Sequence, residues 1–107
     1  MNDLMRPSLY GAFHKIINLS PTDSDKKYYD IVGPVCETGD FIGKDRNLSL
    51  AEGNLLAVVD VGAYGMSMSS NYNSRVRPVE LLVDGDKIRE IRKRENFSDL
   101  IRGESII

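Results

Sequence analysis

The stretch Asn54–Gly65 is the best strand candidate in the chain, and its apolar run, Leu55–Val61, sets the main limit on the fold. It is almost continuously apolar, which is typical of a strand buried on both faces of a sheet. It is also short, and no apolar stretch approaches the roughly 18 residues that a membrane-spanning helix needs. The sequence therefore predicts a mainly β fold with no transmembrane helix.

Other segments also have the composition of strands and turns. Tyr28–Cys36 is rich in β-forming residues and is expected to end where Gly33-Pro34 bends the chain. Asp84-Gly85 is a favoured two-residue hairpin turn between two further strands. The remaining expectations are strands at Phe13–Leu19, Val79–Val83 and Lys87–Arg92, a loop from Glu37 to Asn54, and a final short helix capped by Ser98. Together these elements predict a small β-barrel or sandwich with minor helices.

Composition excludes several classes of function. A length of 107 residues suits one domain, and a net charge of -2 gives no general attraction to nucleic acid or to an anionic membrane. One cysteine forms no internal disulfide, which favours a reduced, cytoplasmic setting, as does an N-terminus without a signal-peptide pattern. One histidine and one cysteine also argue against a structural zinc site.

The only cysteine lies in the segment GPVCETGDF, directly before Glu37 and close to Asp40. A lone cysteine usually serves as a small buried apolar residue. Here it follows a Gly-Pro turn, and nearby carboxylates disfavour the thiolate. A thiol that keeps its proton is a poor nucleophile but a suitable proton donor. Cys36 is therefore either a packing residue or a general acid.

Two further segments carry candidate ligand contacts. Tyr64 lies between glycines in GAYG, which lets the backbone approach a ligand and leaves the ring open; the alternative is a tyrosine packed on a turn. Arg6 and Tyr10 are four residues apart, so a helical turn would place both on one face and suit a carboxylate ligand. The alternative for Arg6 is an ordinary surface arginine, and His14 is interpreted as structural or incidental.

The stretch Lys87–Glu95 is the only basic run. Two glutamates dilute its charge, and the ordinary interpretation is a solvated face. Nucleic-acid binding is the alternative, which salt-sensitive binding to an oligonucleotide would reveal.

Four motifs, taken in order, resemble the C-terminal part of the diaminopimelate decarboxylase family. They are NDLMRPSLYGAFH, GPVCETGDF, VDVGAYGMSMSSNYNSR and RPVELLVDG. Members of this family are pyridoxal 5'-phosphate enzymes that convert meso-2,6-diaminopimelate to L-lysine and carbon dioxide in lysine biosynthesis. Their second domain is a Greek-key-like β-barrel or sandwich of the alanine racemase C-terminal type. The resemblance implies that residues 1–107 are this domain alone.

The resemblance also implies what the chain lacks. The (β/α)8 barrel that binds pyridoxal phosphate would need about 250 residues, and no lysine of this chain lies in a motif matching the family's Schiff-base lysine. The isolated chain is therefore expected to be inactive and to expose a sheet edge, because the family's β domain borrows a strand from before the barrel. The implied partners are the N-terminal barrel and a second subunit, since the family forms homodimers with shared active sites.

Carried over to this chain, the resemblance assigns roles to five residues. Cys36 would return a proton to the α-carbon after carbon dioxide leaves, and Glu37 would bind the distal ammonium of the substrate. Arg6 and Tyr10 would hold the distal carboxylate, and Tyr64 would contact cofactor and substrate. Ornithine decarboxylases typically carry aspartate where Glu37 stands, so the motif favours the diaminopimelate type; Thr38, often serine in the family, is a mild departure.

Two other interpretations remain open at this point. One is a decarboxylase of a related amino-acid substrate. The other is a free-standing dimerisation or regulatory module, which would associate with an intact decarboxylase.

Overall fold

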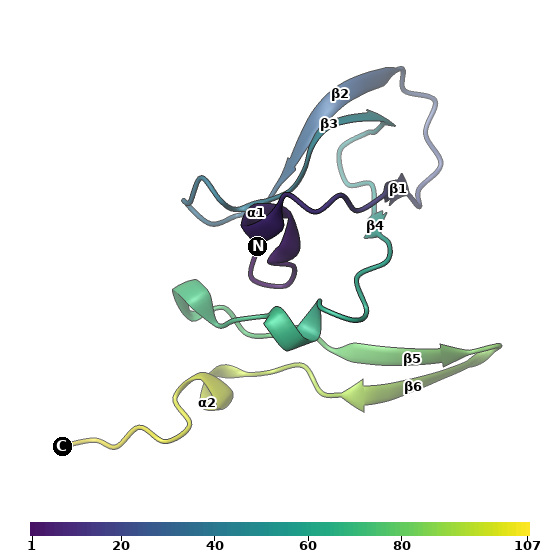
Figure 1. The fold of residues 1–107 in the computed structure, drawn as a ribbon. Helices are drawn as coiled ribbons and strands as arrows, with labels where there is room; N and C mark the ends of the chain where they lie inside the picture. Colours follow the sequence, from purple (N-terminus) through teal and green to yellow (C-terminus); the bar gives the residue numbers. More distant parts are fainter. The chain divides into compact units, whose positions relative to one another are not determined.

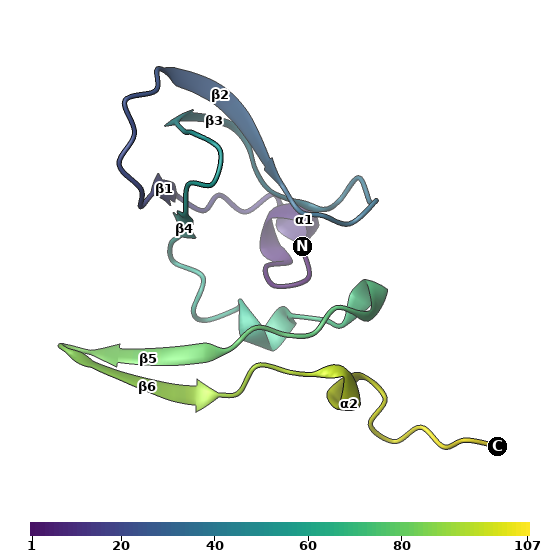
Figure 2. The same ribbon diagram turned by 180° about the vertical axis from the view of Figure 1, so that it is seen from behind.

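Short antiparallel strand pairs make up most of the regular structure. The computed structural model describes all residues 1–107, and the chain divides into two compact units. The first unit holds Met1 and Asp3–Ser69, and the second holds Asn2 and Ser70–Ile107. Six strands form three two-stranded sheets, with the orders β1-β4, β2-β3 and β5-β6 (Figures 1 and 2). The expectation of a mainly β fold with minor helices is confirmed, but no closed barrel forms.

The first unit begins with a helix and continues through two strand pairs. Its elements are α1 (Arg6–Tyr10), β1 (Ile16–Asn18), β2 (Lys26–Val32), β3 (Phe41–Ser49), β4 (Leu56–Val58) and the 3-10 turn η1 (Met66–Met68). Pro7 lies in the first turn of α1, where its missing N–H costs nothing. Gly11 ends the helix at a φ of 66°, a left-handed conformation that glycine adopts without strain.

The loop expected from Glu37 to Asn54 is wrong for its central part, because Phe41–Ser49 forms the longest strand. β3 pairs antiparallel with β2 along its length, with Lys26 opposite Ser49 and Val32 opposite Phe41. Gly43 and the charged residues Lys44, Asp45 and Arg46 interrupt its apolar residues, so the segment lacks the apolar run that usually predicts a strand. Gly43 is buried because the guanidinium of Arg46 packs against it, which leaves no room for a side chain.

The expectation for the apolar stretch Leu55–Val61 is also partly wrong. Only Leu56–Val58 forms a strand, β4, paired antiparallel with β1. Asp60 has a φ of 61° and ends the extended conformation. Leu55 is 69% exposed, so this stretch is not buried on both faces. The strand expected over Phe13–Leu19 is likewise reduced to β1, because it can pair only as far as its short partner allows.

The second unit contains the expected hairpin. Its elements are the 3-10 turn η2 (Tyr72–Ser74), β5 (Glu80–Asp84), β6 (Lys87–Arg92) and α2 (Phe97–Leu100). Asp84 pairs with Lys87, so the turn residues are Gly85-Asp86 rather than Asp84-Gly85. Gly85 has a φ of 61° at the first turn position, which glycine supplies readily.

The final helix α2 confirms the expected short helix but not its expected cap. Asn96, not Ser98, is the N-cap residue, and its side chain accepts a hydrogen bond from the Ser98 backbone N–H. Asp99 completes the capping box by accepting from the Asn96 N–H. The two reciprocal hydrogen bonds satisfy the backbone N–H groups of Asn96 and Ser98, which have no partner within the helix.

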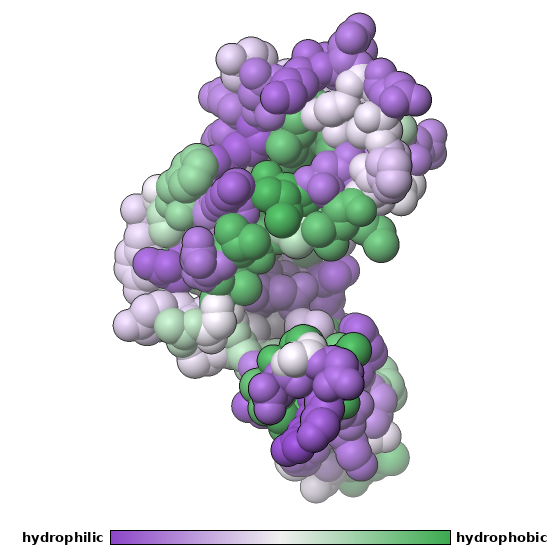
Figure 3. Space-filling view, turned by 90° about the vertical axis from the view of Figure 1, so that its right-hand side faces the viewer, coloured by the Kyte–Doolittle hydropathy of each residue, from purple (hydrophilic) through white to green (hydrophobic).

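Few apolar side chains are buried. Leu4 and Ile16 are the only buried hydrophobic residues, whereas many large ones are exposed. Figure 3 shows hydrophobic surface gathered on the face of the first unit that carries β1 and β4. Leu19 follows β1 and Leu55 precedes β4, and both are exposed. None of the helices is long and apolar enough to cross a membrane.

Candidate functional site

The connection between β2 and β3 carries Cys36, and a buried carboxylate shapes it. The backbone N–H of Gly33 donates to the Asp40 carbonyl at 2.8 Å, which closes the loop at its base. Asp40 is 4% exposed, and its Oδ2 accepts from the Val35 N–H at 2.8 Å. The segment therefore has a defined conformation although it lacks regular structure.

Gly33 is required by the packing of this loop. A Cβ added at Gly33 would lie deep inside the contact radius of all three carboxyl atoms of Asp40. Its backbone is not in the left-handed region, so the requirement is steric rather than conformational. Gly33 and Asp40 together fix the position from which Cys36 projects.

Cys36 and Glu37 lie side by side on the open part of the loop. Both residues are exposed, and Cys36 is a free thiol, so the interpretation of a buried packing cysteine is wrong. Glu37 Oε1 accepts from the Gly39 N–H at 3.2 Å and from Thr38 Oγ1 at 3.3 Å. The glutamate is thereby oriented while it stays accessible to a cationic group. A thiol and a carboxylate are thus presented together to solvent.

Helix α1 supplies the next two candidates and is tied to the same loop. Arg6 and Tyr10 are its first and last residues, as the helical-turn interpretation requires. Tyr10 is 64% exposed. Between them, Ser8 Oγ donates to the carbonyl of Gly39, three residues after Cys36. The helix and the cysteine loop therefore hold a fixed relation to each other.

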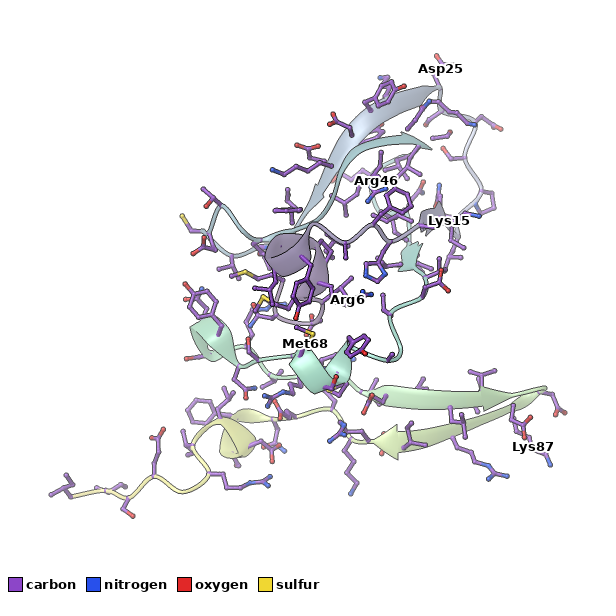
Figure 4. All side chains as sticks on the ribbon, viewed as in Figure 1. Arg6, Lys15, Asp25, Arg46, Met68 and Lys87 are labelled. Carbon is purple, nitrogen blue, oxygen red and sulfur yellow. The ribbon has the colours of Figure 1, made fainter.

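Arg6 turns toward the segment that follows β4, where it meets Tyr64 (Figure 4). Its Cζ lies 5.3 Å from the centroid of the Tyr64 ring, within the range of a cation–π interaction. On the other side, Nη1 lies 3.4 Å from Nε2 of His14. None of the ion pairs of the chain includes Arg6. Its positive charge therefore stays available to an anionic ligand.

Tyr64 lies in a tight turn after β4. The N–H of Gly65 donates to the Val61 carbonyl at 2.7 Å, and a Cβ at Gly65 would lie 2.9 Å from that oxygen, so the turn requires glycine. Nothing lies within 4 Å of a Cβ built at Gly62. Tyr64 is 54% exposed. The turn thus holds the phenol where a ligand can reach it, and packing against Arg6 leaves it accessible.

The five candidates fall into two groups within one chain. Arg6 and Tyr64 are in contact, with Tyr10 on the same helix as Arg6. Cys36 and Glu37 form the second group, and no hydrogen bond or ring contact joins either of them to the first group. Sequence reasoning assigns no positioning role to Ser8, His14 or Asp40, although Ser8 and Asp40 hold the cysteine loop and His14 contacts Arg6. Asp40 lies inside the GPVCETGDF motif, so the motif was the available signal.

The polar stretch after Tyr64 forms a separate ionic cluster in the second unit. Glu95 accepts hydrogen bonds from the Arg77 N–H and from Asn71 Nδ2, both at 2.7 Å, and pairs with Arg77 Nη1 at 3.0 Å. The backbone hydrogen bond from Arg77, then the Asn71 amide, lowers the pKa of Glu95 from 4.5 to about 2. These contacts connect the Asn71–Arg77 segment to Glu95, which lies after β6.

Residues 1–62 match the family model described as the C-terminal sheet domain of pyridoxal-dependent decarboxylases. The chain belongs to this family. It is 55% identical over 107 residues to the diaminopimelate decarboxylase of Pseudomonas aeruginosa, and 56% identical to that of Vibrio cholerae. All of this chain is covered in both cases, but only 26% of each relative. The resemblance inferred from the four motifs is confirmed.

Solved structures agree with the sequence comparison. A diaminopimelate decarboxylase from M. jannaschii superposes with a TM-score of 0.92 at 44% identity, over 100% of this chain and 25% of that one. The enzyme from Helicobacter pylori, solved in complex with L-lysine, gives a TM-score of 0.88 at 50% identity, over 95% of this chain and 25% of that one. The chain thus spans about a quarter of the relatives it matches and corresponds to their C-terminal part.

Proposed function

We propose that this chain is the substrate-side part of a diaminopimelate decarboxylase, which converts meso-2,6-diaminopimelate to L-lysine and carbon dioxide. The observation that carries the proposal is the exposed pair Cys36–Glu37 on a loop fixed by Asp40, in a chain 55% identical to such enzymes. The chain by itself is inactive in this proposal, because it corresponds to only 26% of those relatives.

The residues of this chain could contact pyridoxal phosphate, but they do not supply the lysine that binds it. Every lysine of the chain is exposed, and none forms a hydrogen bond or an ion pair with the candidate site residues. The exposed phenol of Tyr64 would contact pyridoxal phosphate, and the rest of the longer protein would supply the lysine that binds it. The bound cofactor accepts the electron pair that remains on the α-carbon when carbon dioxide leaves.

Cys36 acts as the general acid in this proposal. Loss of carbon dioxide breaks a carbon–carbon bond, and the α-carbon needs a proton in place of the lost carboxyl group. The S–H of Cys36 donates that proton, and the thiolate then recovers one from water. The exposure of Cys36 allows this transfer, and the Asp40–Val35 bond keeps the loop in place while it occurs.

The other candidates bind the end of the substrate that does not react. Glu37 pairs with the distal ammonium, and Arg6 and Tyr10 bind the distal carboxylate through a guanidinium and a phenol. Arg6 forms no ion pair within the chain and Tyr10 is exposed, and both observations support these roles. Decarboxylation leaves the distal carboxylate and ammonium in place, so the product L-lysine keeps both groups.

The proposed partners are a pyridoxal-phosphate-binding barrel in the same protein and a second subunit in a cytoplasmic homodimer. Exposed apolar residues beside β1 and β4 support contact with further protein, because a folded monomer rarely exposes a large apolar patch without a partner. Within one chain no hydrogen bond joins Cys36 to Arg6, and this separation supports a site shared between two subunits. Residues 1–107 would then form the single C-terminal β domain.

The test uses the longer protein that contains this chain, purified with pyridoxal phosphate. Wild-type protein should release carbon dioxide from meso-2,6-diaminopimelate, and Cys36→Ser should lower kcat by about 10²–10⁴-fold, the usual contribution of a general acid. Thr38→Ser, two residues away on the same exposed loop, is the matched control and should stay active. Wild-type protein that leaves diaminopimelate intact, or a fully active Cys36→Ser variant, would overturn the proposal.

A further inference from the structure

His14 is the most completely buried titratable side chain near the candidate site, with 2% of its surface exposed. Its Nδ1 lies 3.1 Å from the carbonyl oxygen of Val59, and its Nε2 lies 3.4 Å from Nη1 of Arg6. The two partners are 45 and 8 residues away along the chain. Both ring nitrogens are therefore used, and one of them contacts a candidate ligand-binding residue.

The chemistry of the two partners fixes the state of the ring. A backbone carbonyl only accepts hydrogen bonds, so Nδ1 must carry the proton that faces Val59. A guanidinium only donates, so Nε2 must keep its lone pair toward Arg6. The imidazole in this arrangement is the uncharged Nδ1–H form. An uncharged ring accepts a hydrogen bond from Arg6 and leaves the positive charge of the guanidinium in place. A carboxylate at this position would neutralise that charge.

Arg6 is thereby held from two sides. The His14 nitrogen accepts from Nη1, and the ring of Tyr64 lies 5.3 Å from Cζ. Arg6 has five N–H donors, and the contact with His14 uses one of them. The other donors stay free for a planar anion such as a carboxylate, which a guanidinium binds through two parallel hydrogen bonds.

We propose that His14 is a positioning residue, which holds the Arg6 guanidinium against Tyr64 so that it binds the distal carboxylate of the substrate. The proposal rests on the proposed function for the identity of that carboxylate. It replaces the interpretation of His14 as merely structural. In this proposal the contact of His14 Nε2 with Arg6 raises the affinity for the ligand. The hydrogen bond from His14 Nδ1 to Val59 stabilises only the local structure.

The two bonds of His14 can be separated by substitution. In His14→Asn the amide lies near the position of Nδ1 and can still donate to Val59, but nothing reaches Arg6. In His14→Gln the longer side chain places an oxygen near Nε2 and can accept from Arg6, but the bond to Val59 is lost. The variants are made in the full-length protein with pyridoxal phosphate bound.

His14→Asn should raise the KM for diaminopimelate by about tenfold with little change in kcat, because one charge-assisted hydrogen bond to the anchoring arginine is lost. L-lysine keeps the distal carboxylate and should inhibit this variant about tenfold more weakly. Cadaverine has no carboxylate, so its inhibition should not change. His14→Gln should restore the KM and the affinity for L-lysine toward the wild-type values.

An unchanged KM in His14→Asn, equal weakening of L-lysine and cadaverine, or a Gln variant as impaired as the Asn variant would each overturn the proposal. Crystal structures of both variants give a readout that needs no activity. Arg6 should leave the Tyr64 ring in His14→Asn and stay there in His14→Gln, and Arg6 in place in both would also overturn it. Wild-type protein inactive on diaminopimelate would instead refute the proposed function, and the crystal structures would still decide the role of His14.

Discussion

The carboxylate of Asp40 packs directly on the Cα of Gly33, at the base of the loop that presents Cys36. The same carboxylate accepts the Val35 N–H at 2.8 Å, and the Gly33 N–H is bonded to the Asp40 carbonyl. These three contacts depend on one another, because each needs the two backbone segments at this separation. A side chain at residue 33 would therefore displace Asp40 and move the cysteine.

Gly33→Ala should lower kcat of the full-length protein by about 10²-fold, because a displacement of about 1 Å in a reacting group costs roughly that much. Gly39→Ala is the matched control on the same loop. A Cβ there would lie 3.6 Å from Met1 Sδ and 3.8 Å from Ser8 Oγ, which are ordinary contacts. Steady-state decarboxylation assays of both variants test this. Equal activity of the two variants would show that the Asp40–Gly33 contact does not set the loop.

The fold was partly predictable from the sequence, and the exceptions have physical causes. The β5-β6 hairpin was found because Asp84-Gly85 marks a turn, and only its register was off by one residue. β3 is not predicted because glycine and charged residues interrupt its apolar positions, and because its pairing with β2 supplies the stability that composition does not show. The strand predicted over the apolar run Leu55–Val61 is too long and too buried. An apolar run indicates contact with other apolar surface, but that surface need not belong to this chain.

The candidate site shows the same division. The motifs predict five site residues, and the structure places all of them at accessible or half-buried positions: Cys36, Glu37, Arg6, Tyr10 and Tyr64. The sequence does not indicate a role for His14, because its partners, Arg6 and the Val59 carbonyl, come together only in the folded chain. Residues that hold others in place depend on long-range contacts, and local patterns do not report those.

Asn2 anchors the start of the second unit, and its charge-changing variant should be destabilising. Its Nδ2 donates to the carbonyls of Tyr72 at 2.7 Å and Ser70 at 3.2 Å, and the residue is 3% exposed. Asn2→Asp replaces both donors with a buried charge facing carbonyl oxygens, which should cost about 2–4 kcal/mol of local stability. Hydrogen exchange of the peptide containing residues 70–72 should become faster.

Asp3→Asn is the control for that variant, because Asp3 is exposed and adjacent in sequence. Its exchange should match the wild type. Unchanged protection at residues 70–72 in Asn2→Asp would show that the two amide bonds contribute little to this segment.

The low pKa of Glu95 predicts a pH-dependent contribution to stability. The backbone N–H of Arg77 and the Asn71 amide bind the ionised carboxylate and lower its pKa from 4.5 to about 2. A group whose pKa is lowered in the folded state stabilises fully above its unfolded value and loses this contribution as pH falls toward the folded value. The Asn71–Arg77 segment should therefore be more protected in wild type than in Glu95→Gln at pH 6, and the difference should shrink below pH 4.5.

Hydrogen exchange of the two proteins at matched pH measures this difference directly. Glu90→Gln is the control, since Glu90 is exposed on β6 and forms no ion pair. A difference between wild type and Glu95→Gln that stays constant from pH 6 to pH 3 would contradict the assigned pKa.

The separation of Cys36 from Arg6 predicts complementation between subunits. If the cysteine loop of one subunit serves the site that contains Arg6 of the other, Cys36→Ser and Arg6→Ala homodimers should each be nearly inactive. A mixed dimer would combine an intact Arg6 with an intact Cys36 in one of its two sites. Random reassembly of an equal mixture should therefore recover about a quarter of the wild-type activity, since half of the dimers are mixed. Activity no higher than that of the separate variants would place Cys36 and Arg6 in the same subunit's site, and the masses of the intact dimers check that mixed dimers have formed.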